Sequence, residues 1–214
     1  IASLERRYGV HFAMGGTGSL IRGMVKLLDQ LGVSVLCGQE VSRILVSQSR
    51  AQGVELSDGR KILGDLVVSN ADTAATFKHL IAPEHRPHWT DRRIDRGKYS
   101  MSLFVWYFGT KRRYEDVPHH MLILGPRYEA LLRDIFHKHH LAKDFSLYLH
   151  RPTATDPQLA PPGCDSFYAL SPVPHLDSGT DWEGHAESYR QAVESVLEQS
   201  VLPGLRHEVI SSRI

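Results

Sequence analysis

Three groups of residues in this chain have types and spacings that can support chemistry: a glycine-rich turn, clustered histidines and two cysteines. The turn is Met14-Gly15-Gly16-Thr17-Gly18-Ser19, and it leads directly into an apolar-periodic stretch. Glycines before a helix let the backbone approach a ligand closely, and the free N–H groups of the helix favour a phosphate or an electron-rich ring. The next glycine after Gly18 is Gly23, so the spacing does not match the Gly-x-Gly-x-x-Gly dinucleotide fingerprint. A purely structural turn and a ligand-facing turn both remain open from these residues alone.

The histidines offer candidate metal ligands. Of the 13 histidines, the clustered ones are the pair His119-His120 and the tract of residues 137–140 (HKHH). A zinc site needs three or four converging ligands, whereas neighbouring histidines on a strand point to opposite faces. The tract ends a predicted helix, where positive charge and solvent exposure are favoured. The sequence therefore predicts no metal site.

The sequence contains no motif that indicates nucleophilic catalysis. Cys37 and Cys164 are isolated and lack Cys-x-x-Cys spacing, which disfavours a disulfide framework or a zinc site and suits a reducing cytoplasm. The chain has no Gly-x-Ser-x-Gly elbow, and Cys164 follows a Pro-Pro-Gly loop with no base implied beside it. No catalytic residue or general base is assigned.

Composition narrows the class of protein. With 214 residues, 42% of them hydrophobic and 23% charged, the chain resembles an ordinary globular protein with a sizeable core. Its formal net charge of +1 gives no basis for nucleic-acid binding. The apolar run 103–108 is too short to span a bilayer. Basic residues 111–113 follow it, which fits a core strand ending in a polar turn and leaves a membrane-surface role open.

The elements that must position these residues can be read from apolar periodicity. Apolar residues recur at helical spacing from Leu20 to Leu31, with Thr17 or Ser19 as the cap and Gly32 at the end. Asp58-Gly59 separates two short apolar runs and predicts a hairpin. The predicted strands of this half are residues 33–36, 41–46, 53–56, 60–63 and 65–69.

A charged, proline-containing segment over residues 73–98 predicts a surface connection and a boundary near 75–98. Beyond it, strands are predicted at residues 102–108, 121–124, 145–149 and 167–171, with helices at 127–136 and 183–199. These elements predict an α+β fold with a mixed or antiparallel sheet in the second half. Both ends look cut, so we expect the chain to be a piece of a larger protein.

Several blocks, in order along the chain, resemble the bacterial-type phytoene desaturases, a family within the flavin-dependent desaturases and amine oxidases. The blocks are residues 12–20 (FAMGGTGSL), 53–60 (GVELSDGR), 67–72 (VVSNAD), 102–109 (SLFVWYFG), 125–128 (GPRY), 144–150 (DFSLYLH), 159–164 (LAPPGC) and 171–176 (SPVPHL). The resemblance covers essentially all of the chain. It implies that residues 1–75 are a central α/β segment of the FAD-binding domain and that residues 76–214 are a truncated substrate-binding domain. Neither the N-terminal pyrophosphate motif nor the C-terminal flavin motif of the family occurs here.

The resemblance also implies roles for particular residues. Val41 matches a position whose backbone contacts the adenine end of FAD. Gly15 and Gly16 match a turn beside the flavin ring, and Thr17 matches its substrate side. The strand end of residues 70–72 matches the return towards the second domain.

For the parent protein, the resemblance implies FAD-dependent removal of hydride and a proton from a C40 isoprenoid in carotenoid biosynthesis. Quinone or oxygen would accept the electrons, at a membrane surface facing the cytoplasm. Alternatives are a carotenoid isomerase, a desaturase of a modified carotenoid, or a non-catalytic module that binds an apolar ligand or a membrane. We expect the piece alone to be inactive and to self-associate through exposed apolar surface.

Overall fold

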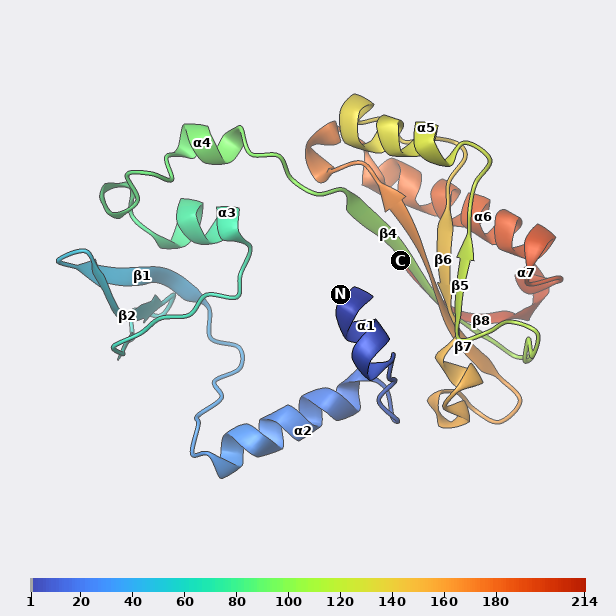
Figure 1. Ribbon diagram of the computed structural model, residues 1–214, viewed down its shortest axis with the longest axis horizontal. Helices are drawn as coiled ribbons and strands as arrows, with labels where there is room; N and C mark the ends of the chain where they lie inside the picture. The colour runs from blue at the N-terminus through green and yellow to red at the C-terminus, as the bar shows by residue number, and fades with distance from the viewer. Residues whose placement is uncertain (1) are drawn as a thin grey trace. The chain divides into compact units, whose positions relative to one another are not determined.

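The computed structural model describes residues 2–214, and they form two compact units. The first unit contains the chain up to Lys26 together with Tyr99–Ile214, and the second contains Leu27–Lys98. Each unit has its own antiparallel sheet (Figure 1). Helices and sheets therefore coexist in separate segments, which confirms the predicted α+β class.

Helix α2 (Thr17–Gln30) begins in the first unit and ends in the second. It confirms the helix predicted from the apolar spacing. Gly32 ends it with a φ of 71°, and the Val33 N–H reaches back to the carbonyl of Leu28 at 2.9 Å, as in a glycine-terminated helix. No residue of α2 is buried by the described residues, so its apolar side is open.

The second unit is built on a three-stranded meander. Strands β1 (Val41–Ser47), β2 (Arg50–Leu56) and β3 (Lys61–Leu63) pair in that order. The Asp58-Gly59 turn joins β2 to β3, as predicted, with the Leu56 N–H donating to the Arg60 carbonyl at 2.8 Å. Short helical segments complete the unit: α3 (Thr73–Ala75), η1 (Thr76–Leu80), η2 (Pro83–His85) and α4 (Asp91–Asp95). Residue Cys37 in this unit is a free, exposed thiol.

Two predicted strands are wrong. Residues 33–36 and 65–69 are not strands, although they carry β-forming side chains. A strand exists only when its backbone groups pair with a neighbour. Neither run has a strand beside it in the described part of the chain, and Leu66 and Val68 are 80% and 82% exposed.

The first unit is organised around a five-stranded sheet in the order β5-β6-β7-β4-β8, with every neighbouring pair antiparallel. Its strands are β4 (Ser102–Thr110), β5 (His120–Ile123), β6 (Leu147–His150), β7 (Asp165–Val173) and β8 (Val209–Arg213). The helical segments of this unit are α1 (Ala2–Tyr8), α5 (Tyr128–Arg133), η3 (Asp134–Lys138), η4 (Pro152–Ala154), η5 (Pro157–Leu159), η6 (Leu176–Ser178), α6 (Trp182–Ser200) and α7 (Leu205–Glu208). The four strands and two helices predicted for this half are thereby confirmed, with shifted ends.

The core lies on one face of this sheet, beneath α6 (Figure 1). Alternate residues of β4, among them Trp106 and Phe108, are buried against the apolar side of α6, which includes Val193 and Leu197. Full burial of each such side chain contributes about 1.5–3 kcal/mol. The run 103–108 is thus a core strand, as favoured from the sequence, and the basic residues 111–113 follow its end.

Candidate functional site

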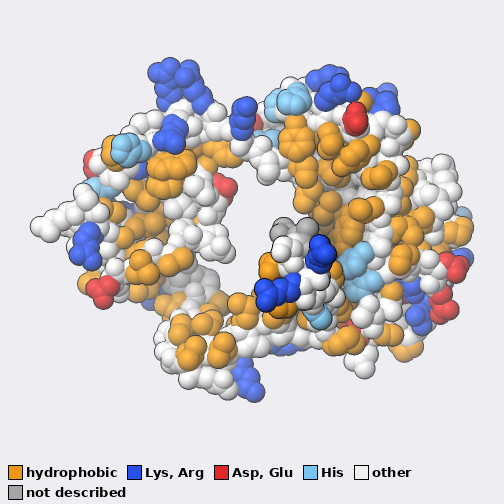
Figure 2. All heavy atoms as spheres, in the orientation of Figure 1, with side chains coloured by type: hydrophobic (Ala, Val, Ile, Leu, Met, Phe, Trp, Pro, Cys, Tyr) orange, Lys and Arg blue, Asp and Glu red, His pale blue; other side chains and the backbone are white. Residues whose placement is uncertain are grey.

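The opposite face of the five-stranded sheet is apolar, aromatic and open. Because side chains alternate along each strand, the residues between the core positions all point to this second face. They are Leu103, Val105 and Tyr107 of β4, Tyr168 and Leu170 of β7, Tyr148 and His150 of β6, and His120 and Leu122 of β5. Tyr107 is 53% exposed and Leu122 is 72% exposed, although both lie within paired strands. Space-filling atoms in Figure 2 show hydrophobic side chains and histidines close together over this unit.

Aromatic rings form a continuous path across this face. The ring centroid of Tyr168 lies 5.7 Å from those of Tyr107 and Tyr148, and 4.5 Å from that of His150. Phe12, which precedes the glycine-rich turn, continues the path at 6.5 Å from His150. Burial and the neighbouring Tyr168 raise the pKa of Tyr148 to about 12, so its hydroxyl stays neutral. This face, called here the open aromatic face, can bind an extended apolar molecule.

The glycine-rich turn is tied to one end of this unit. Gly15 and Gly16 have φ angles of 79° and 73°, a conformation that L side chains rarely adopt. The Gly15 N–H donates to Oδ2 of Asp156 at 2.6 Å, and a Cβ on Gly16 would lie 3.8 Å from the Leu159 side chain. The turn therefore requires glycine for its backbone, and it packs on the segment that follows β6.

A buried ion pair holds that segment in place. Arg151 and Asp165 are almost fully buried, and Nε of Arg151 donates to Oδ2 of Asp165 at 2.9 Å. The same carboxylate accepts from the Thr153 hydroxyl and from the Tyr114 N–H, each at 2.7 Å. Since every partner is hydrogen-bonded, the pair fixes residues 151–156 on β7 and with them Asp156 beneath the turn.

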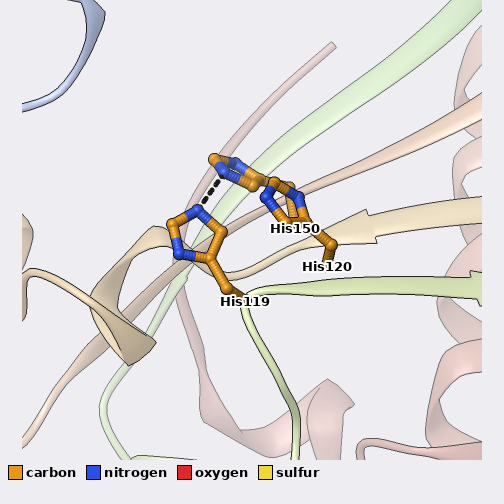
Figure 3. A group of neighbouring side chains, drawn as sticks. All are labelled: His119, His120 and His150. Carbon is orange, nitrogen blue, oxygen red and sulfur yellow. Dashed lines mark hydrogen bonds between the residues drawn. The ribbon is translucent and has the colours of Figure 1, made fainter. Parts of the chain in front are cut away.

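Three histidines meet where β5 begins and β6 ends. His119, His120 and His150 each offer one nitrogen, and these three atoms lie within 4.8 Å of one another (Figure 3). The Nε2 atoms of His119 and His150 share a hydrogen bond of 2.8 Å. Burial and the neighbouring imidazoles lower the pKa of His150 to about 4, and burial and His120 lower that of His119. Both imidazoles are therefore neutral at pH 7.

The sequence analysis was wrong in one premise, that His119 and His120 lie on opposite faces of a strand. His119 and His120 do not point to opposite faces, because their ring centroids are only 4.3 Å apart. His119 lies in a bend just before β5 and is free of the strand's alternation. His150 directly opposes His120 in the β5–β6 register, a pairing that local periodicity does not reveal. The tract of residues 137–140 is exposed, as predicted.

The predicted site residues fall in both units. Gly15, Gly16 and Thr17 lie together in the first unit, at the turn and the first residue of α2. Val41 is the first residue of β1 in the second unit, on an edge strand. Asp156 was not recognised from the sequence, since only its position beneath the turn distinguishes it.

Bacterial phytoene desaturases are similar to this chain in sequence. Over 98% of this chain, 45% of residues are identical to those of the neurosporene-forming phytoene desaturase of Rhodobacter capsulatus. Over its whole length the chain is 44% identical to the lycopene-forming phytoene desaturase of Pseudescherichia vulneris. The chain spans 41% and 44% of the length of these two relatives. No family model matches the chain.

The fold is shared with solved structures. An oxidoreductase from Methanosarcina mazei matches 94% of this chain with a TM-score of 0.67 at 22% identity, over 42% of its own length. A protein from Pyrococcus furiosus matches 94% of this chain and 42% of its own length, with a TM-score of 0.64 at 14% identity. From the sequence relationships, the chain is a homologue of the bacterial phytoene desaturases over essentially its whole length, and it spans about 41–44% of such a protein.

Proposed function

We propose that the protein carrying this chain is a flavin-dependent desaturase of a long isoprenoid in carotenoid biosynthesis. The observation that carries the proposal is the open aromatic face, which occurs in a chain homologous to phytoene desaturases. A polyene or its precursor offers only apolar contacts and π-electrons, and such a ligand suits tyrosine rings arranged in a path. The relatives also include proteins named as desaturases of 4,4'-diapophytoene and of zeta-carotene.

FAD is the cofactor we propose, and it would accept the hydride removed from an allylic carbon. The turn at Gly15 and Gly16 supports this because a bare backbone there lets a planar ring approach. Thr17 follows on the proposed substrate side. The position of Val41 supports its proposed contact with the adenine end of FAD. One edge of β1 has no strand beside it in the described residues, so its backbone groups can bind a ligand. Within this chain, the open aromatic face contacts and orients the isoprenoid.

The membrane surface is the proposed source of substrate. Within the described residues, no helix is both long enough and apolar enough to cross a membrane. We propose peripheral attachment at the cytoplasmic side, with quinone or oxygen as the electron acceptor. The apolar side of α2, where Leu20 and Met24 are 56% and 55% exposed, is the surface through which we expect the isolated chain to self-associate.

The decisive experiment places a charge on the open aromatic face. Tyr107→Glu changes a side chain that is already 53% exposed, so folding is little affected, but a carboxylate among apolar contacts disfavours an isoprenoid. We expect kcat/KM with phytoene in liposomes to fall at least ~10-fold, the effect of about 1.4 kcal/mol. Ala192→Glu, on the exposed side of α6 across the sheet, is the matched control.

The readout is the polyene absorbance of the FAD-loaded, complete protein. A red shift as conjugation lengthens supports a desaturase. Turnover of carotenoid with unchanged conjugation would instead identify an isomerase. If the complete protein neither binds FAD nor turns over carotenoid, the result would favour a non-catalytic module that binds an apolar ligand.

The turn is tested separately by Gly16→Val. Its φ of 73° and the nearby Leu159 make a branched side chain unfavourable, so we expect FAD content or substrate affinity to fall. Gly23→Ala is the control, because Gly23 lies in α2 with no atom within 4 Å of the added Cβ. Normal FAD content and turnover in Gly16→Val would contradict the proposed role of the turn.

A further inference from the structure

We propose that His119, His120 and His150 form a binding site for a borderline-soft divalent transition-metal ion, for which Zn²⁺ is the probe. The proposal rests on their convergence, with one nitrogen from each ring lying within 4.8 Å of the other two. It is argued independently of the desaturase proposal, from the positions of the ring nitrogens, although His120 and His150 also lie on the open aromatic face.

The atoms are close to a ligating arrangement. Zinc–nitrogen distances of about 2.0–2.1 Å put the ligand nitrogens of a tetrahedral site about 3.3 Å apart. The Nε2 atoms of His119 and His150 are already 2.8 Å apart, and one proton lies between them. A metal ion can engage the Nε2 lone pairs of both rings once this proton moves to Nδ1 of the ring that carries it. His120 is exposed and can rotate to supply the third nitrogen.

Two of the three opposite ring nitrogens have the hydrogen bonds that metal-bound histidines need. Nδ1 of His119 lies 2.5 Å from the Thr155 hydroxyl, and Nδ1 of His120 lies 2.5 Å from the Tyr148 hydroxyl. An Nδ1–H held by an oxygen fixes the tautomer and directs the Nε2 lone pair towards a metal. His150 has a buried Nδ1 with no partner in the described part of the chain, so its ring is not committed to another hydrogen-bond network.

The donor set selects the class of metal. Three imidazoles without a carboxylate in the group suit Zn²⁺, Co²⁺, Ni²⁺ or Cu²⁺, and not Mg²⁺ or Ca²⁺, which prefer oxygen. Three ligands leave a further position for water. The Phe12 ring packs edge-on against His119 at 4.7 Å and shields one side of the site. A bound ion would link the bend before β5, strand β5 and the end of β6.

The test uses the purified complete protein after treatment with a chelator. We expect one Zn²⁺ per chain in competition with a chromophoric chelator, and visible d–d absorption of four- or five-coordinate Co²⁺ bound at the same site. His150→Phe keeps a ring beside Tyr168 and removes both nitrogens. It should weaken Zn²⁺ binding by more than the ~10–100-fold that loss of an outer partner costs.

Thr155→Val and His119→Gln keep the proposal testable if His150→Phe does not fold. Thr155→Val removes only the hydroxyl beside His119 and should weaken binding by ~10–100-fold. The matched control is His137→Ala/His140→Ala, which removes two exposed histidines outside the group and should leave affinity and stoichiometry unchanged. The proposal is overturned if the unmodified protein binds no stoichiometric Zn²⁺, if the site variants bind as it does, or if the control loses binding equally.

Discussion

Removing the buried carboxylate of Asp165 should destabilise the first unit strongly. In Asp165→Ala, Arg151 keeps its charge at 3% side-chain exposure but loses its carboxylate, and Thr153 and the Tyr114 N–H lose their acceptor. Leaving one member of a buried ion pair uncompensated costs ~3–5 kcal/mol. Three hydrogen bonds to a charged group, at ~1.5–3 kcal/mol each, would sum to more, but such terms are not additive within a network. We therefore expect a loss of ~3–5 kcal/mol.

Urea unfolding followed by tryptophan fluorescence, to which the fully buried Trp106 contributes, measures this loss. Asp177→Ala is the control, because its side chain is 88% exposed and its loss should cost under ~0.5 kcal/mol. In the double variant Arg151→Met/Asp165→Ala, the loss should be smaller than the sum of the single losses by ~0.5–3 kcal/mol. Faster hydrogen exchange at the Gly15 amide should accompany the loss, since the network holds its acceptor. An Asp165→Ala variant as stable as Asp177→Ala would refute this reasoning.

The remaining predictions concern a strand pairing and a pH dependence. Gly53→Ala should cost ~1–3 kcal/mol and speed amide exchange in β2 and β3, because the added Cβ would lie 2.2 Å from the Ile62 carbonyl oxygen. Gly64→Ala is the control and should change stability little. Equally fast amide exchange in the two variants would contradict the predicted clash at Gly53. Burial raises the pKa of Tyr189 from 10.0 to about 12, so the unfolded state loses its proton first and stability falls as the pH rises from about 10 to 12. The loss of stability at pH 12 should approach ~2–3 kcal/mol. This loss should be smaller in Tyr189→Phe, which also removes the hydrogen-bond partner of Ser171 at every pH. If stability falls as steeply with pH in Tyr189→Phe as in the unmodified protein, Tyr189 is not the cause.

Most elements of the fold could be predicted from local pattern. Helix α2, the Asp58-Gly59 turn and strands β4 and β7 follow from apolar spacing and turn residues within short windows. The failures at 33–36 and 65–69 have a single cause. Their composition favours strands, but strand formation needs a neighbouring backbone, and periodicity contains no information about that neighbour.

The candidate site was predictable only in part. The glycine-rich turn stood out because its residue types are unusual in sequence. The sequence predicted no metal site, because the convergence of the three histidines depends on a bend before β5 and on the register that sets His120 opposite His150. The open aromatic face needed the strand order, because Tyr107, Tyr148 and Tyr168 are dispersed along the chain and meet only through β6-β7-β4 pairing.

The sequence by itself determined most of the helical and extended segments, which side chains of each strand share a face, and which family the chain resembles. These properties follow from contacts within a few residues and from the order of the matching sequence blocks along the chain. Only the tertiary structure decided what lies beside what. Gly15 meets Asp156 across 141 residues, and three histidines converge from a bend and two strands. Such meetings depend on strand order and on the buried Arg151–Asp165 pair, whose energies arise only once the chain has folded.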